Sequence, residues 1–210
     1  MRIAGIVLAG GRSSRFGSAK LAAELDGRSL LDHAIEAVAA VSTETLVVIG
    51  PDGPAPELPP GVRTVRDREA FGGPLAGLAA ALDTTEAPIA IVVGGDMPRL
   101  RPEVLRAMLA ALESRDVGGP PPDAVVLEDA GGPRPLPLAI RVERARVAAA
   151  ATLASSQRSL RALLDRLVVR VLRPDEWRQL DPGGDTLRDV DRVEDLERVR
   201  ASDPPERGLP

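Results

Sequence analysis

Short apolar runs alternate with stretches of helical periodicity along most of the chain. Runs typical of buried strands occupy residues 2–8, 45–49, 62–65, 88–93, 124–127, 136–140, 168–172 and 186–190. Helices are predicted at residues 29–41, 74–82, 102–112, 142–153, 159–167 and 193–199. Strands that alternate with helices predict an α/β fold, with a mostly parallel central sheet between two helical layers in a three-layer α/β/α arrangement.

The length of the chain predicts a single domain. At about 150 residues per domain, 210 residues favour one domain at 1–201, and three prolines mark 202–210 as a tail. No apolar run reaches about 18 residues, and the apolar stretch at 2–8 is short for a signal peptide. We therefore expect a cytoplasmic protein that is a monomer or a weak oligomer, with no membrane partner.

The composition excludes several classes of chemistry. Because the chain has no cysteine, it has no disulfide, thiolate zinc site, iron–sulfur cluster or cysteine nucleophile. His33 is the single histidine, so a Ser-His-Asp triad would depend on it alone, and we expect it at the surface or core edge of the first helix. A net charge of -4 and two Phe with one Trp argue against a nucleic-acid partner.

A glycine-rich, basic loop follows the first predicted strand. Gly10 and Gly11 let the backbone approach a ligand closely, and consecutive N–H groups in such a loop bind anions. Arg12, Arg15 and Lys20 add positive charge, and Lys20 is the one lysine among 27 basic residues. The expected ligand is a polyphosphate, and an ordinary surface loop is the alternative. The spacing fits neither a Walker A loop nor a G-x-G-x-x-G fingerprint.

This loop, LAGGRSSRFGSAK at residues 8–20, resembles the signature of the molybdenum cofactor guanylyltransferase (MobA) family. The resemblance spans nearly the whole chain and implies a Rossmann-like nucleotidyltransferase fold. It also implies two groups of site residues: Leu8, Ala9, Gly10 and Gly11 at the nucleotide, with Lys20 and Arg15 on the phosphates as catalytic cations. The family usually has aspartate where this chain has Ala19, which weakens the assignment to the guanylyl branch.

A second block consists of Asp67 and the sequence GGPLAG at residues 72–77. It predicts a strand end, a turn and a helix that starts with proline and directs its positive dipole end into the crevice. The block resembles the family's acidic residue followed by G-P-L-A-G, which implies that Asp67 contacts guanine through N1–H and the exocyclic amine. A solvated aspartate at a helix entry is the alternative, and the family's asparagine is missing near Gly50.

Asp96 follows the most apolar predicted strand and is the main candidate for a metal ligand. A carboxylate at the carboxyl end of a buried strand points into the crevice of an α/β fold. Mg²⁺ binds through one or two carboxylates together with substrate phosphates. The alternative is a cap for the helix near Pro102. The sequence Asp96-Met97-Pro98 also resembles the family's D-x-P block, whose aspartate coordinates magnesium.

The C-terminal region supplies further candidates. Alternation places Asp189 and Asp191 on one face of a strand end. Resemblance to a family D-x-D block makes Asp191 a second metal ligand and Asp189 an acceptor contact, whereas a helix N-cap completed by Glu194 is the alternative for Asp191. The family's strand and helix motifs near the acceptor suggest acceptor contacts from Arg134, Ser159 and Arg161.

The resemblance implies a Mg²⁺-dependent nucleotidyltransferase that moves GMP from GTP onto the terminal phosphate of molybdopterin and releases pyrophosphate. The acceptor phosphate is already ionised at neutral pH, so the chemistry needs no general base. Three other functions remain open: a cytidylyl or other nucleotidyl transfer to a different phosphorylated small molecule, an NAD-dependent oxidoreductase, and a non-catalytic nucleotide-binding module.

Overall fold

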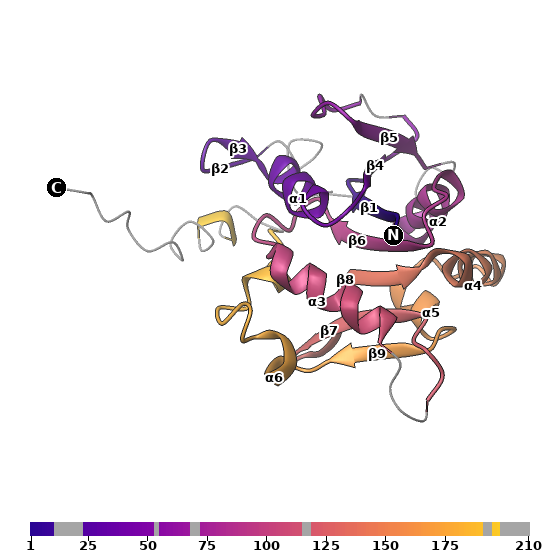
Figure 1. The fold of residues 1–210 in the computed structure, drawn as a ribbon. Coiled ribbons are helices and arrows are strands. Elements are labelled where there is room, and N and C mark those ends of the chain that lie inside the picture. The colour runs from indigo at the N-terminus through magenta and orange to yellow at the C-terminus, as the bar shows by residue number, and fades with distance from the viewer. Residues whose placement is uncertain (11–22, 53–54, 68–71, 115–118, 191–194, 198–210) are drawn as a thin grey trace.

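The computed structural model describes residues 1–10, 23–52, 55–67, 72–114, 119–190 and 195–197, and their main feature is a seven-stranded sheet (Figure 1). Its strands are β1 (Ile3–Leu8), β4 (Glu44–Ile49), β5 (Val62–Arg66), β6 (Ile89–Gly94), β7 (Ala124–Asp129), β8 (Gly132–Arg141) and β9 (Val169–Leu172). The spatial order is β5-β4-β1-β6-β8-β7-β9, and only β8 runs antiparallel to its neighbours. The predicted mostly parallel sheet is therefore confirmed.

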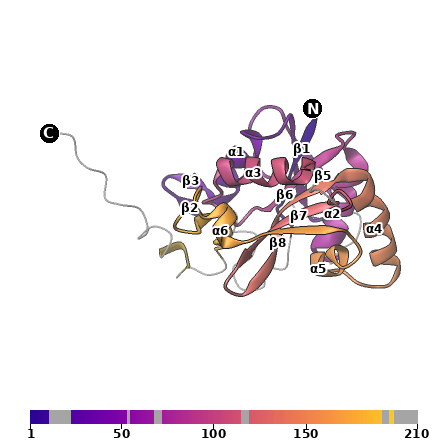
Figure 2. The ribbon, with the colours of Figure 1, turned by 60° about the horizontal axis from the view of Figure 1, so that its bottom comes forward.

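Helices cover both faces of this sheet (Figure 2). One face carries α1 (Leu30–Ala39), α3 (Pro102–Glu113) and the short α6 (Pro174–Trp177), and the other carries α2 (Gly73–Thr84), α4 (Val142–Ala154) and α5 (Leu160–Leu164). Each face of the sheet has its own hydrophobic core, and alternate side chains of β6 enter the two. Ile91 and Val93 belong to the first core, and Ala90 and Val92 belong to the second. The three-layer prediction is confirmed.

No helix in the described ranges is long and apolar enough to cross a membrane.

A small hairpin of β2 (Glu24–Leu25) and β3 (Arg28–Ser29) lies outside the main sheet, and the apolar pattern did not predict it. Asp26 and Gly27 form its turn with φ values of 53° and 75°. An Asp-Gly pair with two positive φ angles is typical of a tight two-residue hairpin turn. The signal was therefore present in the turn residues, while the strands were too short to show alternation.

The strand predicted at residues 186–190 is wrong. Residues Asp185–Leu187 form a single 3₁₀ turn, η2, and the chain continues without a strand partner. The buried Thr186 explains this, because its N–H donates to the carboxylate of Asp181 (2.7 Å) and its hydroxyl accepts from the N–H of Arg101 (3.2 Å). Local hydrogen bonds thus satisfy the groups that a sheet would have paired. Within the region predicted as a helix at 193–199, residues 195–197 are helical.

The strand order reverses at β1. The chain passes from β1 to β4 and β5 on one side, then crosses through α2 to place β6 on the other side of β1. In open α/β sheets the ligand crevice lies at the carboxyl ends of the strands at such a reversal. The architecture alone therefore directs attention to the residues that follow β1, β4, β5 and β6.

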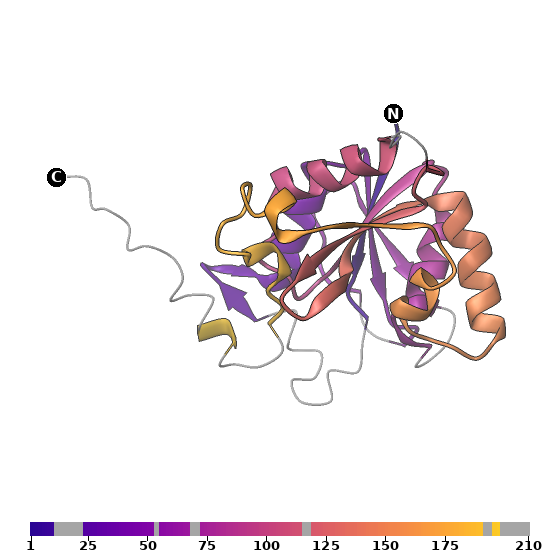
Figure 3. The same ribbon diagram turned by 90° about the horizontal axis from the view of Figure 1, so that it is seen from below.

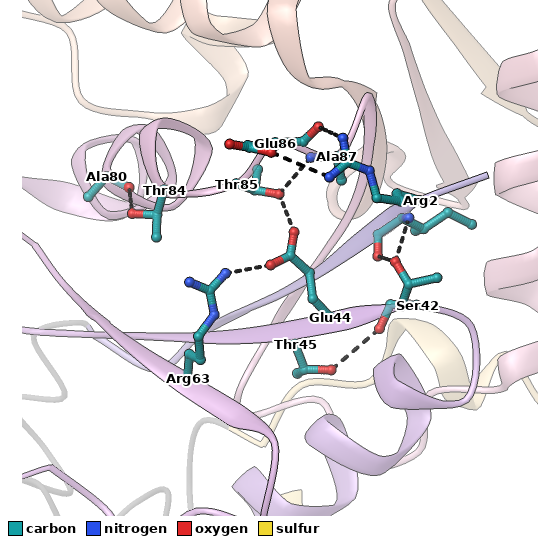
Figure 4. Close-up of polar contacts among 12 residues, drawn as sticks. Arg2, Ser42, Glu44, Thr45, Arg63, Ala80, Thr84, Thr85, Glu86 and Ala87 are labelled. Carbon is teal, nitrogen blue, oxygen red and sulfur yellow. Dashed lines mark hydrogen bonds and ion pairs between the residues drawn. The ribbon is translucent and has the colours of Figure 1, made fainter.

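A polar network lies at the amino ends of the strands, away from the crevice at their carboxyl ends (Figure 4). The carboxylate of Glu44 at the start of β4 accepts hydrogen bonds from the Arg63 guanidinium and the Thr85 hydroxyl. The same hydroxyl accepts from the backbone N–H of Ala87 (3.0 Å), which fixes the turn before β6. Glu44 thus joins β4, β5 and the α2–β6 connection.

Replacing Glu44 with alanine is expected to lower the free energy of unfolding by about 1 kcal/mol, since two donors lose a charged acceptor at a site partly open to water. Urea denaturation measures the change. The matched control is Glu57→Ala, at an exposed carboxylate in the loop between β4 and β5. Equal midpoints for the two variants would contradict a stabilising role for the network.

Candidate functional site

A small cleft opens at the strand-order reversal. It is lined by residues from the ends of β1 and β4, the residue after β5 and the first turns of α2: Leu8, Gly10, Val48, Ile49, Gly50, Asp67, Gly73, Pro74 and Gly77. Leu8, Gly10 and Asp67 are three of the residues that the sequence assigned to the nucleotide. The structure therefore brings two separate motifs to one cleft.

Backbone hydrogen bonds fix the rim of this cleft. The N–H of Ala9 donates to the carbonyl of Val48 (2.8 Å), and the N–H of Asp67 donates to the carbonyl of Ile49 (2.9 Å). A Cβ on Gly10 would lie 3.2 Å from the backbone nitrogen of Gly50. The two turns are therefore so close that a larger residue at position 10 would be crowded.

Asp67 faces the first turns of α2. Its side chain is half-buried, and its Oδ2 lies 3.9 Å from the position that a Cβ on Gly77 would occupy. Beside it, the guanidinium of Arg66 donates to the carbonyl oxygens of Gly50 (3.3 Å) and Pro51 (3.0 Å). The carboxylate is therefore an acceptor in the wall of a narrow cleft, whose opposite wall is a helix N-terminus.

Gly50 and Gly73 belong to this cleft, although sequence reasoning gave neither a role. Gly73 has a φ of 77°, and a Cβ there would lie 2.9 Å from the carbonyl oxygen of Arg158. The N–H of Leu75 donates to that same oxygen (3.4 Å). The Gly-Pro start of α2 gave a signal for a special turn, but nothing in the sequence pointed to its contact with Arg158.

Asp96 follows β6 by two residues and is half-buried. Its Oδ1 lies 2.5 Å from the position that a Cβ on Gly94 would occupy, so the carboxylate folds back over the strand end where only glycine fits. The N–H of Gly95 donates to the carbonyl of Leu8 (3.0 Å), which places this turn beside the end of β1. The N–H of Val190 donates to the carbonyl of Asp96 itself (2.9 Å).

The single Asp96 carboxylate at the end of β6 is compatible with a Mg²⁺ site. Among the described residues, no group of three His, Cys, Asp or Glu side chains converges on one point. Mg²⁺ does not need such a cage, because it keeps several waters and takes one or two carboxylates plus substrate phosphates. Asp96 can supply one carboxylate at the crevice. Asp191, the other predicted ligand, follows Val190 in the sequence but lies outside the described residues.

Several predicted residues of the phosphate loop, Gly11, Arg12, Arg15 and Lys20, also lie outside the described residues. The described chain ends at Gly10 on the cleft and resumes at Ala23, whose carbonyl accepts from the N–H of Leu30 (3.0 Å). Glu194, the residue in the capping alternative for Asp191, is outside the described ranges as well.

The candidate acceptor residues fall into two places. Arg134 on β8 pairs with Asp189 (3.5 Å) and with Asp129 of β7 (3.1 Å), so two of the four candidates contact each other. Ser159 is the N-cap of α5, where its hydroxyl accepts from the N–H of Ala162 (3.2 Å), and Arg161 is exposed on that helix. Since Arg158 contacts the start of α2, α5 also begins beside the cleft.

His33 has a structural position. Its Nε2 lies 2.8 Å from the carbonyl oxygen of Leu25, and the side chain is half-buried between α1 and the β2–β3 hairpin. This agrees with the expectation of a residue at the core edge.

Comparisons with known proteins agree with this geometry. A family model described as MobA-like NTP transferase domain matches residues 5–171. A protein of Chloroflexus aggregans, named probable molybdenum cofactor guanylyltransferase, is 31% identical over 207 residues, covering 96% of this chain and 95% of the relative.

Solved structures share the fold. The crystal structure of molybdopterin-guanine dinucleotide biosynthesis protein A from Archaeoglobus fulgidus has a TM-score of 0.73 and 23% identity, covering 94% of this chain and 97% of that chain. The 2-C-methyl-D-erythritol 4-phosphate cytidylyltransferase from Thermus thermophilus has a TM-score of 0.67 and 17% identity, covering 93% and 96%. The fold thus occurs in proteins whose names refer to different nucleotides.

Proposed function

This chain belongs to the MobA-like NTP transferase family, and we propose that it transfers GMP from GTP to the terminal phosphate of molybdopterin. The observation that supports this most is the cleft at the strand-order reversal, where the start of the phosphate loop and the Asp67 carboxylate meet. The enzyme is a nucleotidyltransferase, and its place is in the biosynthesis of the molybdenum cofactor.

The proposed reaction is an in-line displacement at phosphorus. An oxygen of the acceptor's terminal phosphate bonds to the α-phosphorus of GTP while the bond from that phosphorus to the bridging α–β oxygen breaks, and the electron pair leaves with pyrophosphate. The protein forms no covalent bond, so its contribution is positioning and charge neutralisation. Backbone N–H groups of the loop after β1 bind the phosphates, and Lys20 and Arg15 stabilise the charge that develops on the leaving group.

Nucleotidyltransferases of this family work with a divalent metal ion, and for this chain we assign Mg²⁺ to Asp96, with Asp191 as the second ligand. A Mg²⁺ ion held by these carboxylates would neutralise charge on the phosphate oxygens and polarise the α-phosphorus. Gly94 is part of this assignment, because the space above it is filled by the Asp96 carboxylate. For the acceptor we assign Arg134 and Asp189 on one side of the crevice and Ser159 and Arg161 on the other.

The Asp67 carboxylate favours guanine over cytosine. Guanine presents two adjacent donors, N1–H and the exocyclic amine, and a carboxylate accepts from both. Cytosine presents one amine beside the acceptor nitrogen N3, which would face a carboxylate oxygen unfavourably. The half-buried position of Asp67 makes this mismatch costly, since less water is available to separate the two acceptors.

Pyrophosphate release tests the proposal. Purified protein is incubated with Mg²⁺, molybdopterin and each of the four nucleoside triphosphates in turn. Release with GTP alone supports the proposal, and preferential release with CTP would establish the cytidylyl alternative. Binding of GTP without release in the presence of molybdopterin would identify a non-catalytic module, and a thermal shift with NAD but no release with any triphosphate would favour the oxidoreductase.

Replacing Asp67 with asparagine is expected to raise the KM for GTP by about tenfold to a hundredfold, because an amide accepts at one atom and opposes the second donor of guanine with its own N–H. Steady-state kinetics with GTP and ITP measure the effect. Since ITP lacks the exocyclic amine, the difference in KM between GTP and ITP should shrink in the variant.

Asp83→Asn is the matched control, since Asp83 is an exposed carboxylate near the other end of α2. Unchanged KM values for GTP in Asp67→Asn would remove Asp67 from base recognition.

A further inference from the structure

The β2–β3 hairpin and the first residue of α1 form a small hydrophobic cluster of their own with residues 190 and 196. Leu25 and Leu30 are fully buried, and they pack with Val190 and Leu196, which are 2% and 8% exposed. This cluster is separate from both cores of the sheet. Figure 3 shows the hairpin and the yellow C-terminal turn on the same side of the molecule. Two segments distant in sequence are therefore held together by four side chains.

Both members of this pair are also attached to the turn that carries Asp96. From the C-terminal segment, the N–H of Val190 donates to the carbonyl of Asp96 (2.9 Å). From the hairpin, Asp26 at the tip forms an ion pair with Arg99, three residues beyond Asp96 (3.1 Å). The exposed side-chain fractions of Arg99 and Asp26 are 22% and 51%. The Asp96 turn is thus attached to the cluster through Val190, and Arg99 beyond it is attached to the hairpin tip through Asp26.

The hairpin also occupies a particular place in the chain. It begins four residues after Lys20, and Ala23 packs against the cluster. The contact of His33 with Leu25 and the hydrogen bond from Leu30 to Ala23 attach the hairpin to α1. The hairpin is therefore attached to α1 as well as to the C-terminal segment.

From these contacts, and resting on the proposed function, we infer that the hairpin, Leu30, Val190 and Leu196 act as a clasp that holds the turn carrying Asp96 in position. In the proposed function Asp96 acts on the triphosphate through the metal, so a shift of its turn weakens nucleotide binding. Asp26, Arg99, Leu25 and Leu196 are positioning residues in this arrangement. Because the cluster is small, it opens at lower cost than the main cores.

Leu196→Ala tests the clasp, with Leu109→Ala as its matched control. Leu109 is 7% exposed and packs in the main core on α3, so both variants lose the same atoms at similar burial. In Leu196→Ala, hydrogen exchange at the Val190 amide should accelerate by about tenfold or more, and the KM for GTP should rise by about tenfold with a smaller change in kcat. Leu109→Ala should lower the urea midpoint of unfolding, but its KM for GTP should equal that of the wild type.

A milder pair of variants keeps the inference testable if Leu196→Ala folds poorly. Asp26→Asn retains a residue that tolerates the left-handed turn, and Arg99→Gln removes the other charge. Each should raise the KM for GTP by about twofold to fivefold, as expected for a partly exposed ion pair, and the double variant should be no worse than either single one. The Arg99→Lys variant keeps the positive charge, so its KM for GTP should stay closer to the wild-type value than that of Arg99→Gln.

The two readouts separate the inference from the proposed function. If the wild-type protein released no pyrophosphate with GTP, the proposed function would fail, while the exchange rate of the Val190 amide would still report on the clasp. Equal exchange rates at Val190 in the wild type and Leu196→Ala, or additive effects of Asp26→Asn and Arg99→Gln, would overturn the clasp.

Discussion

Replacing Asp96 with alanine is expected to lower kcat for nucleotidyl transfer by about a thousandfold or more, while the thermal unfolding midpoint changes little. The expectation follows from the position of the carboxylate, which folds over Gly94 at the carboxyl end of β6 beside the end of β1. Without it, the metal that offsets phosphate charge loses the described carboxylate that we assign to it. Steady-state kinetics over a Mg²⁺ titration measure the loss.

The appropriate control for Asp96 is Asp175→Ala. Asp175 carries an ordinary carboxylate on α6 with a side chain 76% exposed, so its removal changes the net charge equally without touching the crevice. We expect Asp175→Ala to keep its turnover and Mg²⁺ dependence. An Asp96→Ala enzyme with normal turnover and an unchanged Mg²⁺ requirement would take Asp96 out of the metal site.

Lys20 should be the second most sensitive position, and Lys20→Arg is expected to lower kcat/KM by about a hundredfold although the chain uses arginine almost everywhere else. A lysine ammonium is a compact charge on a flexible stem, whereas a guanidinium is planar and larger, so it does not take the same place on a phosphate. Stopped-flow or steady-state measurement of pyrophosphate release gives the ratio.

The control is the reverse exchange, Arg106→Lys, at a position away from the crevice. Arg106 is exposed on α3 and pairs with Glu103. It should leave kcat/KM unchanged. If Lys20→Arg stayed within a few-fold of the wild type, the lone lysine would reflect composition rather than a specific phosphate contact.

The layers of the fold were predictable because burial on both faces leaves a direct mark on sequence. Residues Ile89–Gly94 form one unbroken apolar run, and alternate side chains enter the two cores. Helix α1 showed one apolar face, and its N-cap Ser29 accepts from the N–H of Asp32. Patterns within single elements were therefore enough to predict a mostly parallel sheet between two helical layers.

Features that depend on partners distant in sequence were not predictable in this way. Nothing in residues 132–141 shows that β8 runs antiparallel between β6 and β7. The apolar spacing of residues 186–190 suggested a strand because it could not reveal that Asp181 and Arg101 satisfy Thr186. The pairing of Arg134 with Asp189 is likewise a contact across 55 positions that no local motif encodes.

The candidate site likewise contains residues that the sequence predicted and residues that only the structure brings to it. The resemblance implied that Leu8, Gly10 and Asp67 contact the nucleotide, and the structure places all three in one cleft. Gly50 and Gly73 joined them only through the close approach of separate turns. The roles of the individual residues remain predictions, and the variants above test them one by one.

The product formed from GTP tests the central claim most directly. Purified protein, GTP, Mg²⁺ and molybdopterin are combined, and the pterin product is identified by mass spectrometry. The predicted result is molybdopterin guanine dinucleotide in equal amount to the pyrophosphate released. Unmodified molybdopterin after full incubation with GTP, or a pterin product carrying cytidylate when CTP is offered in competition, would contradict the proposed function.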